Sequence, residues 1–242
     1  MDLAVDRTIS IMDTMQCVDQ PEEYFVAGRS ALFAIQECLR AAGFNNAPNS
    51  ILDLPSGHGR VLRWLKVAYP QASIVACDTD RDAVDFCRKQ FGVEGVYSEV
   101  DPRCIPISDK FELIWVGSLL THLSRYLWDT WLTWFREHLT DNGILVLSTN
   151  GITAARFIRH KYSFWIQDLP NEGVQLHEDY AAAGFGYVDY QTKAGYGLSL
   201  SQPSIVMGIL ESCAMQPVFF RVNAFHGCQD VFGAMKSDSS NL

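Results

Sequence analysis

Acidic and glycine residues recur at spacings that could build a site for an adenosine-containing ligand. The apolar run 51–54 contains Asp53 and leads into the turn Pro55-Ser-Gly-His-Gly59, and a second apolar run, 73–77, is followed by Asp78. Glycines in such a turn let backbone N–H groups approach a ligand closely. A carboxylate at the end of the next strand can accept hydrogen bonds from both ribose hydroxyls. The pattern predicts a nucleotide-type pocket.

Alternating strands and helices must hold these residues in place. A helix is predicted over residues 22–42, strands over 50–54, 73–78, 95–100, 111–117 and 143–149, and helices over 59–69, 80–91 and 125–139. Short apolar strands that alternate with helical patterns predict an α/β fold, with a parallel sheet and helices on both faces. Ligands of such sheets bind at the carboxyl ends of the strands, so the turn and Asp78 should lie at the same edge.

The pattern changes after Asn150. Residues 151–201 are rich in glycine and aromatic residues, with a strand predicted over 186–192; beyond them, a helix that begins near Pro203 and a closing strand pair (217–225 and 231–235) are predicted. We interpret residues 1–242 as a single domain. Its parts are an N-terminal helical cap (1–49), a cofactor-binding core (50–150), an acceptor lid insertion (151–201) and a closing helix and strand pair (202–242).

Composition excludes several classes of function. The chain has 242 residues and a net charge of −9, which argues against nucleic acid as a partner because phosphate binding needs a basic surface. Seven cysteines, with no C-x-x-C pair, favour reduced thiols of a cytoplasmic protein, and no metal-ligand spacing occurs. No apolar run approaches the roughly 18 residues of a membrane span. The oligomeric state stays open.

The glycine turn alone does not identify the ligand. A dinucleotide-binding turn has the pattern G-x-G-x-x-G, but here Gly57-His-Gly59 is followed by Arg60, Val61 and Leu62, so the third glycine is missing. This departure disfavours an NAD-dependent oxidoreductase, which stays an alternative. No G-x-x-x-x-G-K-[ST] pattern for a nucleoside triphosphate occurs.

Five spaced motifs in residues 50–150 resemble class I S-adenosylmethionine-dependent methyltransferases. The motifs are Asp53-Leu-Pro-Ser-Gly57-His-Gly59, Asp78 after the second strand, Asp101-Pro-Arg-Cys-Ile-Pro106, Phe111-Glu-Leu-Ile-Trp-Val-Gly-Ser-Leu-Leu-Thr-His122-Leu123 and Leu139-Thr-Asp-Asn-Gly143. Pro55 and Ser56 replace the common Gly-Cys pair. The resemblance implies a Rossmann-like, seven-stranded, mostly parallel sheet whose last strand is antiparallel, with an N-terminal helix over the cofactor. It also implies S-adenosyl-L-methionine as the cofactor.

The resemblance further implies a role for each residue of the cofactor site. The turn with Pro55, Ser56, Gly57 and Gly59 would meet the amino-acid portion, and Asp53 would receive its ammonium, directly or through water. Asp78 would accept from the ribose, Asp101 from the adenine amine, and Thr79 and Pro102 would flank the adenine. Gly117 and Ser118 would lie at the carboxyl edge of the sheet. For Asp101, the alternative is a turn role, because Asp-Pro also begins turns. Asp80, two residues after Asp78, could be the cap of the following helix.

The acceptor is predicted to be a small molecule or a glycan, methylated on oxygen. A hydroxyl acceptor benefits from a histidine base, and His122 follows the fourth strand; His177 and His226 are alternatives, and each could instead be structural. The lid aromatics Tyr162, Trp165, Tyr180, Tyr187 and Tyr196 suit sugar rings, aromatic rings or lipid-like chains, or form a satellite core or a dimer interface.

Residues 195–200 and 226–232 are similar to uncharacterised bacterial methyltransferases associated with glycan assembly. A non-catalytic cofactor-binding or interaction module stays a further alternative.

Overall fold

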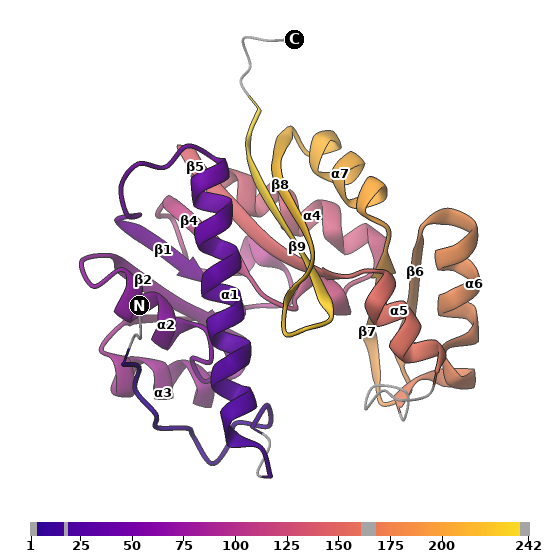
Figure 1. Cartoon of the computed structure of the whole chain (residues 1–242), viewed down its shortest axis with the longest axis horizontal. Helices are drawn as coiled ribbons and strands as arrows, with labels where there is room; N and C mark the ends of the chain where they lie inside the picture. The colour runs from indigo at the N-terminus through magenta and orange to yellow at the C-terminus, as the bar shows by residue number, and fades with distance from the viewer. Residues whose placement is uncertain (1–3, 17–18, 161–167, 238–242) are drawn as a thin grey trace.

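A seven-stranded sheet with the order β3-β2-β1-β4-β5-β9-β8 forms the centre of the molecule (Figure 1). The computed structural model describes residues 4–16, 19–160 and 168–237. The strands are β1 (Ser50–Asp53), β2 (Ser73–Asp78), β3 (Glu94–Tyr97), β4 (Phe111–Val116), β5 (Leu139–Asn150), β8 (Met215–Phe225) and β9 (Gln229–Lys236). All run parallel except β9, which is antiparallel to both of its neighbours. The predicted fold, including the antiparallel last strand, is confirmed.

Helices cover both faces of this sheet. The helices of the core are α1 (Pro21–Ala41), α2 (Leu62–Ala68), α3 (Arg81–Phe91), α4 (Arg125–Glu137) and α7 (Pro203–Ser212), with short 3-10 turns η1 (Pro102–Cys104) and η2 (Leu120–His122). Neighbouring strand residues point to opposite faces, so Ile51 packs with α1 and α2 while Leu52 packs with α4 and α7. This double burial explains why the central strands are continuous apolar runs.

Helix α3 shows how local sequence sets the ends of an element next to the predicted site. The Asp80 carboxylate accepts from the backbone N–H groups of Asp82 (3.0 Å) and Ala83 (3.4 Å), which caps the first turn. Gly92 ends the helix in the left-handed conformation, with φ of 61°. The capping alternative for Asp80 is therefore confirmed, and α3 begins three residues after Asp78.

A smaller unit lies beside the sheet, at the right of Figure 1. It consists of α5 (Ile152–Arg159), η4 (Pro170–Gly173), α6 (Val174–Ala183) and the hairpin of β6 (Phe185–Tyr190) and β7 (Lys193–Ser201), which forms a second sheet. The sequence predicted only one strand here. The helices of this unit and β7 were not predicted. They share one small apolar cluster, so each contributes only a few buried residues and its hydrophobic periodicity is too short to recognise. Tyr162 and Trp165 lie outside the described residues.

Among the strands, predicted and observed bounds differ most at the third and the fifth. The third strand ends at Tyr97 and not at residue 100, although the N–H of Ser98 still donates to the Asp78 carbonyl at 2.8 Å; the chain bends at Val100. The fifth strand begins at Leu139 and not at residue 143, because Leu139 already pairs with Phe111 before an irregularity in the ladder. Among the described residues, no helix is both long and apolar enough to cross a membrane.

Candidate functional site

The glycine turn is held directly by the acidic residue at the end of β2. The backbone N–H of Gly57 donates to one carboxylate oxygen of Asp78 at 2.7 Å, and the N–H of Asp80 donates to the other at 2.9 Å. Gly57 and Gly59 have φ angles of 48° and 78°. Burial raises the pKa of Asp78 although both backbone bonds oppose this shift. The structure thus brings the two most prominent sequence features into contact.

Arg63 holds the other side of this turn and was missed by the sequence reasoning. Its guanidinium is fully buried and donates to the carbonyl of Gly59 at 2.9 Å and to the carbonyls of Asp6 and Thr8 at 2.8 and 3.0 Å. The N-terminal segment is therefore fastened to the glycine turn. The one available signal was a charged residue inside the apolar run Leu62-Arg-Trp-Leu65.

Asp53 is a buried carboxylate that receives no hydrogen bond from the residues that the structure describes. Only 1% of the residue is exposed, and neither carboxylate oxygen has a partner. Burial, followed by the negative charge of Asp78, raises the pKa of Asp53 well above its usual value, while the charge of Arg60 lowers it. Arg60 makes no hydrogen bond to the described residues, and burial lowers the pKa of its guanidinium. Two opposite charges thus lie near each other, and neither has a hydrogen-bonded partner.

Replacing Asp53 with Asn should stabilise the ligand-free protein at neutral pH. The pKa of Asp53 is higher in the folded than in the unfolded state, so its ionisation removes stability as the pH rises above about 4. We expect a gain of about 1 kcal/mol at pH 8 and less at pH 5, measured by thermal melts across this range. The exposed Asp109→Asn is the control. A lower melting temperature of Asp53→Asn at pH 8 would contradict this account.

The two glycines of the turn should differ in their tolerance of a side chain. A Cβ at Gly59 would lie 2.5 Å from the ring of Phe91, whereas a Cβ at Gly57 meets nothing within 4 Å. Both have a positive φ, so alanine is strained at either position by roughly 1 kcal/mol, and the clash adds to this at Gly59. Chemical denaturation should show Gly59→Ala to be the less stable variant by about 1–3 kcal/mol. Equal stabilities would falsify the predicted contact.

The residues after β3 are placed at the turn that the sequence predicted. The Asp101 carboxylate accepts from the backbone N–H of Arg103 at 3.0 Å and forms an ion pair with its guanidinium at 2.7 Å, which lowers the pKa of Asp101. Pro102 is buried, and Thr79 is exposed beside Asp78. Asp101 thus caps the short helix η1, and its contact with adenine stays a prediction.

Gly117 and Ser118 follow β4, and Ser118 is held on every side. It has a φ of 63°, which is unusual for a residue with a side chain. Its N–H donates to the hydroxyl of Ser148 at 2.8 Å, its own hydroxyl lies 3.0 Å from Nε2 of Gln229, and its carbonyl accepts from Thr121 at 2.7 Å. Ser148 and Gln229 were not found from sequence, because the bonds connect β4, β5 and β9.

His122 lies at the end of η2 against the hairpin of the lid. Its Nδ1 is 2.9 Å from the carbonyl oxygen of Gly197 and 3.0 Å from the hydroxyl of Tyr190, and its ring stacks on Tyr196 at 4.8 Å. Among the described residues, Nε2 has no hydrogen-bond partner. Burial lowers the pKa of His122, so the imidazole is neutral at pH 7. Burial, and then the charge of Asp78, raises the pKa of Tyr196 to about 12.

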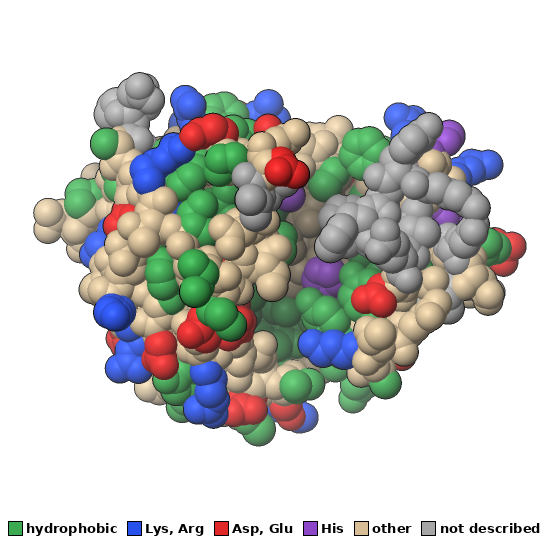
Figure 2. All heavy atoms as spheres, turned by 90° about the horizontal axis from the view of Figure 1, so that it is seen from below, with side chains coloured by type: hydrophobic (Ala, Val, Ile, Leu, Met, Phe, Trp, Pro, Cys, Tyr) green, Lys and Arg blue, Asp and Glu red, His purple; other side chains and the backbone are tan. Residues whose placement is uncertain are grey.

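Figure 2 shows a hollow between the part that carries the large sheet and the part that carries the lid, with a histidine and hydrophobic side chains inside it. The two alternative histidines belong to other elements. His177 lines a separate hollow of about 530 Å³ between α5 and α6. His226 is in the turn between β8 and β9, where burial and then the charge of Arg60 lower its pKa.

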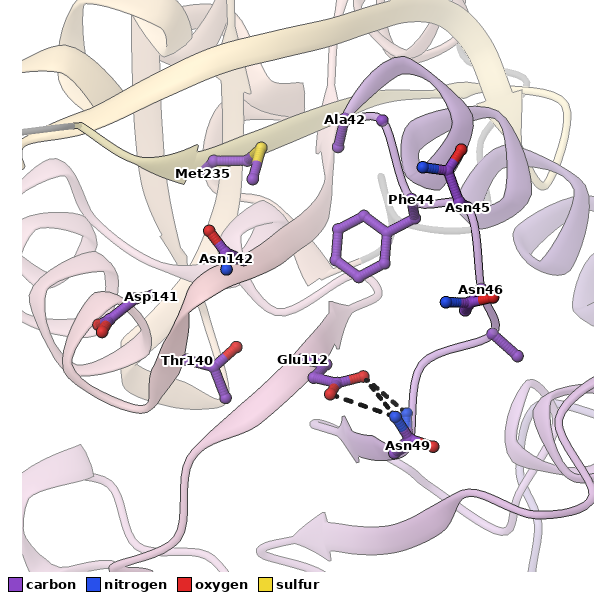
Figure 3. A pocket seen from close by; sticks show the side chains of 12 residues that line it. Ala42, Phe44, Asn45, Asn46, Asn49, Glu112, Thr140, Asp141, Asn142 and Met235 are labelled. Carbon is purple, nitrogen blue, oxygen red and sulfur yellow. Dashed lines mark hydrogen bonds between the residues drawn. The ribbon is translucent and has the colours of Figure 1, made fainter.

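Another hollow of about 730 Å³ opens at the opposite edge of the sheet (Figure 3). There, Glu112 near the start of β4 accepts from the backbone N–H of Asn49 at 2.8 Å and from its side chain. None of the residues predicted to bind the cofactor lines it. Within the described part of the chain, no group of three or more His, Cys, Asp or Glu could hold a metal ion.

Comparison with known protein families supports the resemblance drawn from the motifs. A family model described as a methyltransferase domain matches the segment from β1 to Gly143. The matched segment is residues 51–143. The match confirms the predicted enzyme class. Among curated protein sequences, none matches the chain.

Solved methyltransferase structures share the fold at low sequence identity. A 1,6-didemethyltoxoflavin-N1-methyltransferase from Burkholderia thailandensis, with that compound and S-adenosylhomocysteine bound, is 14% identical; 91% of this chain and 84% of that chain align, with a TM-score of 0.61. The magnesium protoporphyrin IX methyltransferase from Synechocystis PCC 6803, with bound SAH, is 11% identical, with 92% and 89% aligned and a TM-score of 0.61.

A glycopeptide N-methyltransferase complexed with S-adenosyl-L-homocysteine is 15% identical, with 84% of this chain and 86% of that chain aligned and a TM-score of 0.55. These neighbours are consistent with the predicted cofactor, S-adenosylmethionine.

Proposed function

We propose that this methyltransferase transfers a methyl group from S-adenosylmethionine to a hydroxyl of a small molecule or glycan. The observation that carries the proposal is the geometry of His122, whose Nδ1 is held by the Gly197 carbonyl at 2.9 Å while no described residue bonds to Nε2. A hydroxyl has a high pKa, so its proton must be taken up as the oxygen attacks. The solved neighbours include two enzymes whose names place the methyl group on nitrogen, so the preference for oxygen rests on His122.

The chemistry of the turn fits the amino-acid end of this cofactor. Asp53 lacks a donor and would receive one from the ammonium group, directly or through water, and the guanidinium of Arg60 could take the carboxylate. Gly57 and Gly59 bring the backbone of the turn close, with Pro55 and Ser56 beside them. The amino-acid end of the cofactor carries one ammonium and one carboxylate, so it would supply a partner of opposite charge to both Asp53 and Arg60.

The remaining predicted residues would hold the nucleoside. Asp78 uses its two carboxylate oxygens for one backbone N–H each, and carboxylate oxygens can accept further bonds from ribose hydroxyls. Thr79, Asp101 and Pro102 would lie around the adenine. Gly117 and Ser118 would form the edge near the reacting methyl.

In the proposed reaction, Nε2 of His122 would take up the proton of the acceptor hydroxyl as its oxygen attacks. The cofactor, when bound, would supply an electrophilic methyl group on a sulfonium whose sulfur keeps the bonding electrons. The lid excludes water and positions the acceptor against the rings of Tyr190 and Tyr196. His122 then returns its proton to solvent.

Two further parts of the proposal concern the setting of the enzyme. Cys38, Cys77 and Cys87 are buried free thiols, which supports a cytoplasmic location. The resemblance of residues 195–200 and 226–232 to enzymes associated with glycan assembly supports a glycan among the acceptors to be tested.

Calorimetry and a transfer assay test the function together. S-adenosylmethionine and its demethylated product should bind with a Kd of roughly micromolar, and a labelled methyl group should pass to hydroxylated sugars or aromatic compounds in an acceptor panel. Binding of NAD without S-adenosylmethionine would favour the oxidoreductase. Cofactor binding without transfer to any acceptor would favour the non-catalytic module, and transfer only to amines would overturn the oxygen preference.

A further inference from the structure

The contacts of His122 determine which ring nitrogen carries the proton. A backbone carbonyl can only accept a hydrogen bond, so the 2.9 Å contact between Nδ1 and the carbonyl oxygen of Gly197 requires a hydrogen on Nδ1. In the neutral ring, Nε2 then holds a lone pair, and no residue in the described part of the chain bonds to it. The hydroxyl oxygen of Tyr190, 3.0 Å from Nδ1, is a second acceptor for the same hydrogen.

The Gly197 carbonyl is itself held firmly in place. Strand β7 is fastened to the core by the Ser199 hydroxyl, which donates to the carbonyl of Leu120 at 2.8 Å, and by Asn150, whose side chain donates to the carbonyl of Ser199 at 3.2 Å. Within the hairpin, a Cβ at Gly197 would lie 1.9 Å from the carbonyl oxygen of Val188, so the two strands approach closely there. The acceptor of the Nδ1 hydrogen therefore has little freedom to move.

Tyr190 holds the ring from the other strand of the hairpin. The His122 and Tyr190 rings lie 5.9 Å apart between centroids, and burial raises the pKa of Tyr190 far enough that the hydroxyl stays protonated. Because the bond to Nδ1 uses only the hydroxyl oxygen, the Tyr190 hydrogen is left to donate elsewhere. No acceptor for it occurs among residues 4–16, 19–160 and 168–237.

We propose that Tyr190 is a positioning residue, which together with the Gly197 carbonyl holds His122 as its Nδ1–H tautomer and keeps Nε2 as the proton acceptor. This inference rests on the proposed function, since it describes how the base of that reaction is prepared. It assigns to the lid a part in the proton transfer in addition to acceptor binding. A backbone carbonyl and a phenol hydroxyl here perform the orienting role that a carboxylate has in many catalytic pairs.

Four groups of the lid hairpin lie at or near the imidazole: Tyr190, Lys193, Tyr196 and the Gly197 carbonyl. The Tyr196 ring stacks on the imidazole, and burial raises the pKa of Tyr196 to about 12, so it adds no charge near neutral pH. Tyr190 and the Gly197 carbonyl accept from Nδ1 and so favour the protonated ring. The Lys193 ammonium lies 4.3 Å above the ring of Tyr196 and, after burial, lowers the pKa of His122. Removal of the Tyr190 hydroxyl removes one group that favours protonation, so it should move the titration of His122 to lower pH.

Nitrogen NMR of the full-length protein, labelled at histidine, tests this without an acceptor. The His122 signals are identified by their loss in His122→Gln, and at pH 8 they should show the Nδ1–H tautomer. Tyr190→Phe should shift the His122 titration to lower pH. Tyr187→Phe is the matched control, because the Tyr187 hydroxyl donates to Asp189 at 2.6 Å and does not touch His122.

An Nε2–H tautomer in the wild-type protein would overturn the inference, whatever the variants do. An unchanged titration in Tyr190→Phe, or an equal shift in Tyr187→Phe, would remove Tyr190 from its role. The proposed function fails separately, if the Nδ1–H tautomer is found but no hydroxyl acceptor is methylated. Transfer to a hydroxyl with an Nε2–H histidine would leave the function standing and refute the positioning.

Discussion

Replacing His122 with Gln should slow methyl transfer to a hydroxyl acceptor by about 10²- to 10⁴-fold, the usual contribution of a general base. Glutamine retains polar groups of similar reach, but it has no nitrogen that takes up a proton near neutral pH. Burial lowers the pKa of His122, so the wild-type rate should be independent of pH above about 6.5 and fall only on the acid side. Initial rates between pH 5 and 9 measure both effects.

Two controls separate base catalysis from structural damage. Cofactor affinity of His122→Gln should be unchanged, because no residue proposed to bind the cofactor contacts this ring. His160→Gln, at an exposed position after α5, should keep the wild-type rate. If His122→Gln retains both the rate and the acid-side fall, a different group takes the proton.

The second large effect is expected at Asp78. Asp78→Ala should weaken binding of S-adenosylmethionine by about 100-fold or more, which corresponds to about 2.7 kcal/mol. The substitution removes the proposed acceptor of the ribose hydroxyls, and it also releases the N–H of Gly57, which Asp78 holds at 2.7 Å. Calorimetric titration gives the change in affinity directly. Asp78→Asn, which keeps one side-chain oxygen, should lose less.

Asp80→Asn is the matched control for Asp78. Asp80 is two residues away and exposed, and asparagine caps a helix about as well as aspartate, so cofactor affinity and α3 should both be preserved. If Asp80→Asn weakens binding as much as Asp78→Ala, the effect is one of overall negative charge and the ribose assignment is wrong. Wild-type affinity in Asp78→Ala would exclude this carboxylate from the cofactor site.

The sheet could be predicted because its signals are local. Apolar runs such as 73–77 need no distant partner to be recognised, and Asp80 and Gly92 mark the ends of α3 by their own chemistry. The closeness of Gly57 and Asp78 also follows from sequence, since adjacent parallel strands bring their carboxyl ends together. The identities and order of these residues were therefore enough for the fold and the centre of the candidate site.

The supporting contacts could not be predicted, because their partners lie far apart in the chain and several are backbone atoms. Arg63 bonds to carbonyls of Asp6 and Thr8, and any residue type offers a carbonyl. Gly197 likewise contributes only its backbone oxygen to His122. A single sequence carries no pattern that pairs such positions, so the packing of the chain alone reveals them.

The small second sheet has a consequence for the transfer of acceptor preference between enzymes. Residues that would select the acceptor and the carbonyl that fixes the proton of His122 are on one hairpin. A chimera that exchanges residues 152–201 would therefore replace the recognition surface and the chemical partner of the base at once. For such a chimera to be active on the new acceptor, it must also receive the η2 segment of the donor enzyme, or it must keep Tyr190 and Gly197 as the partners of His122.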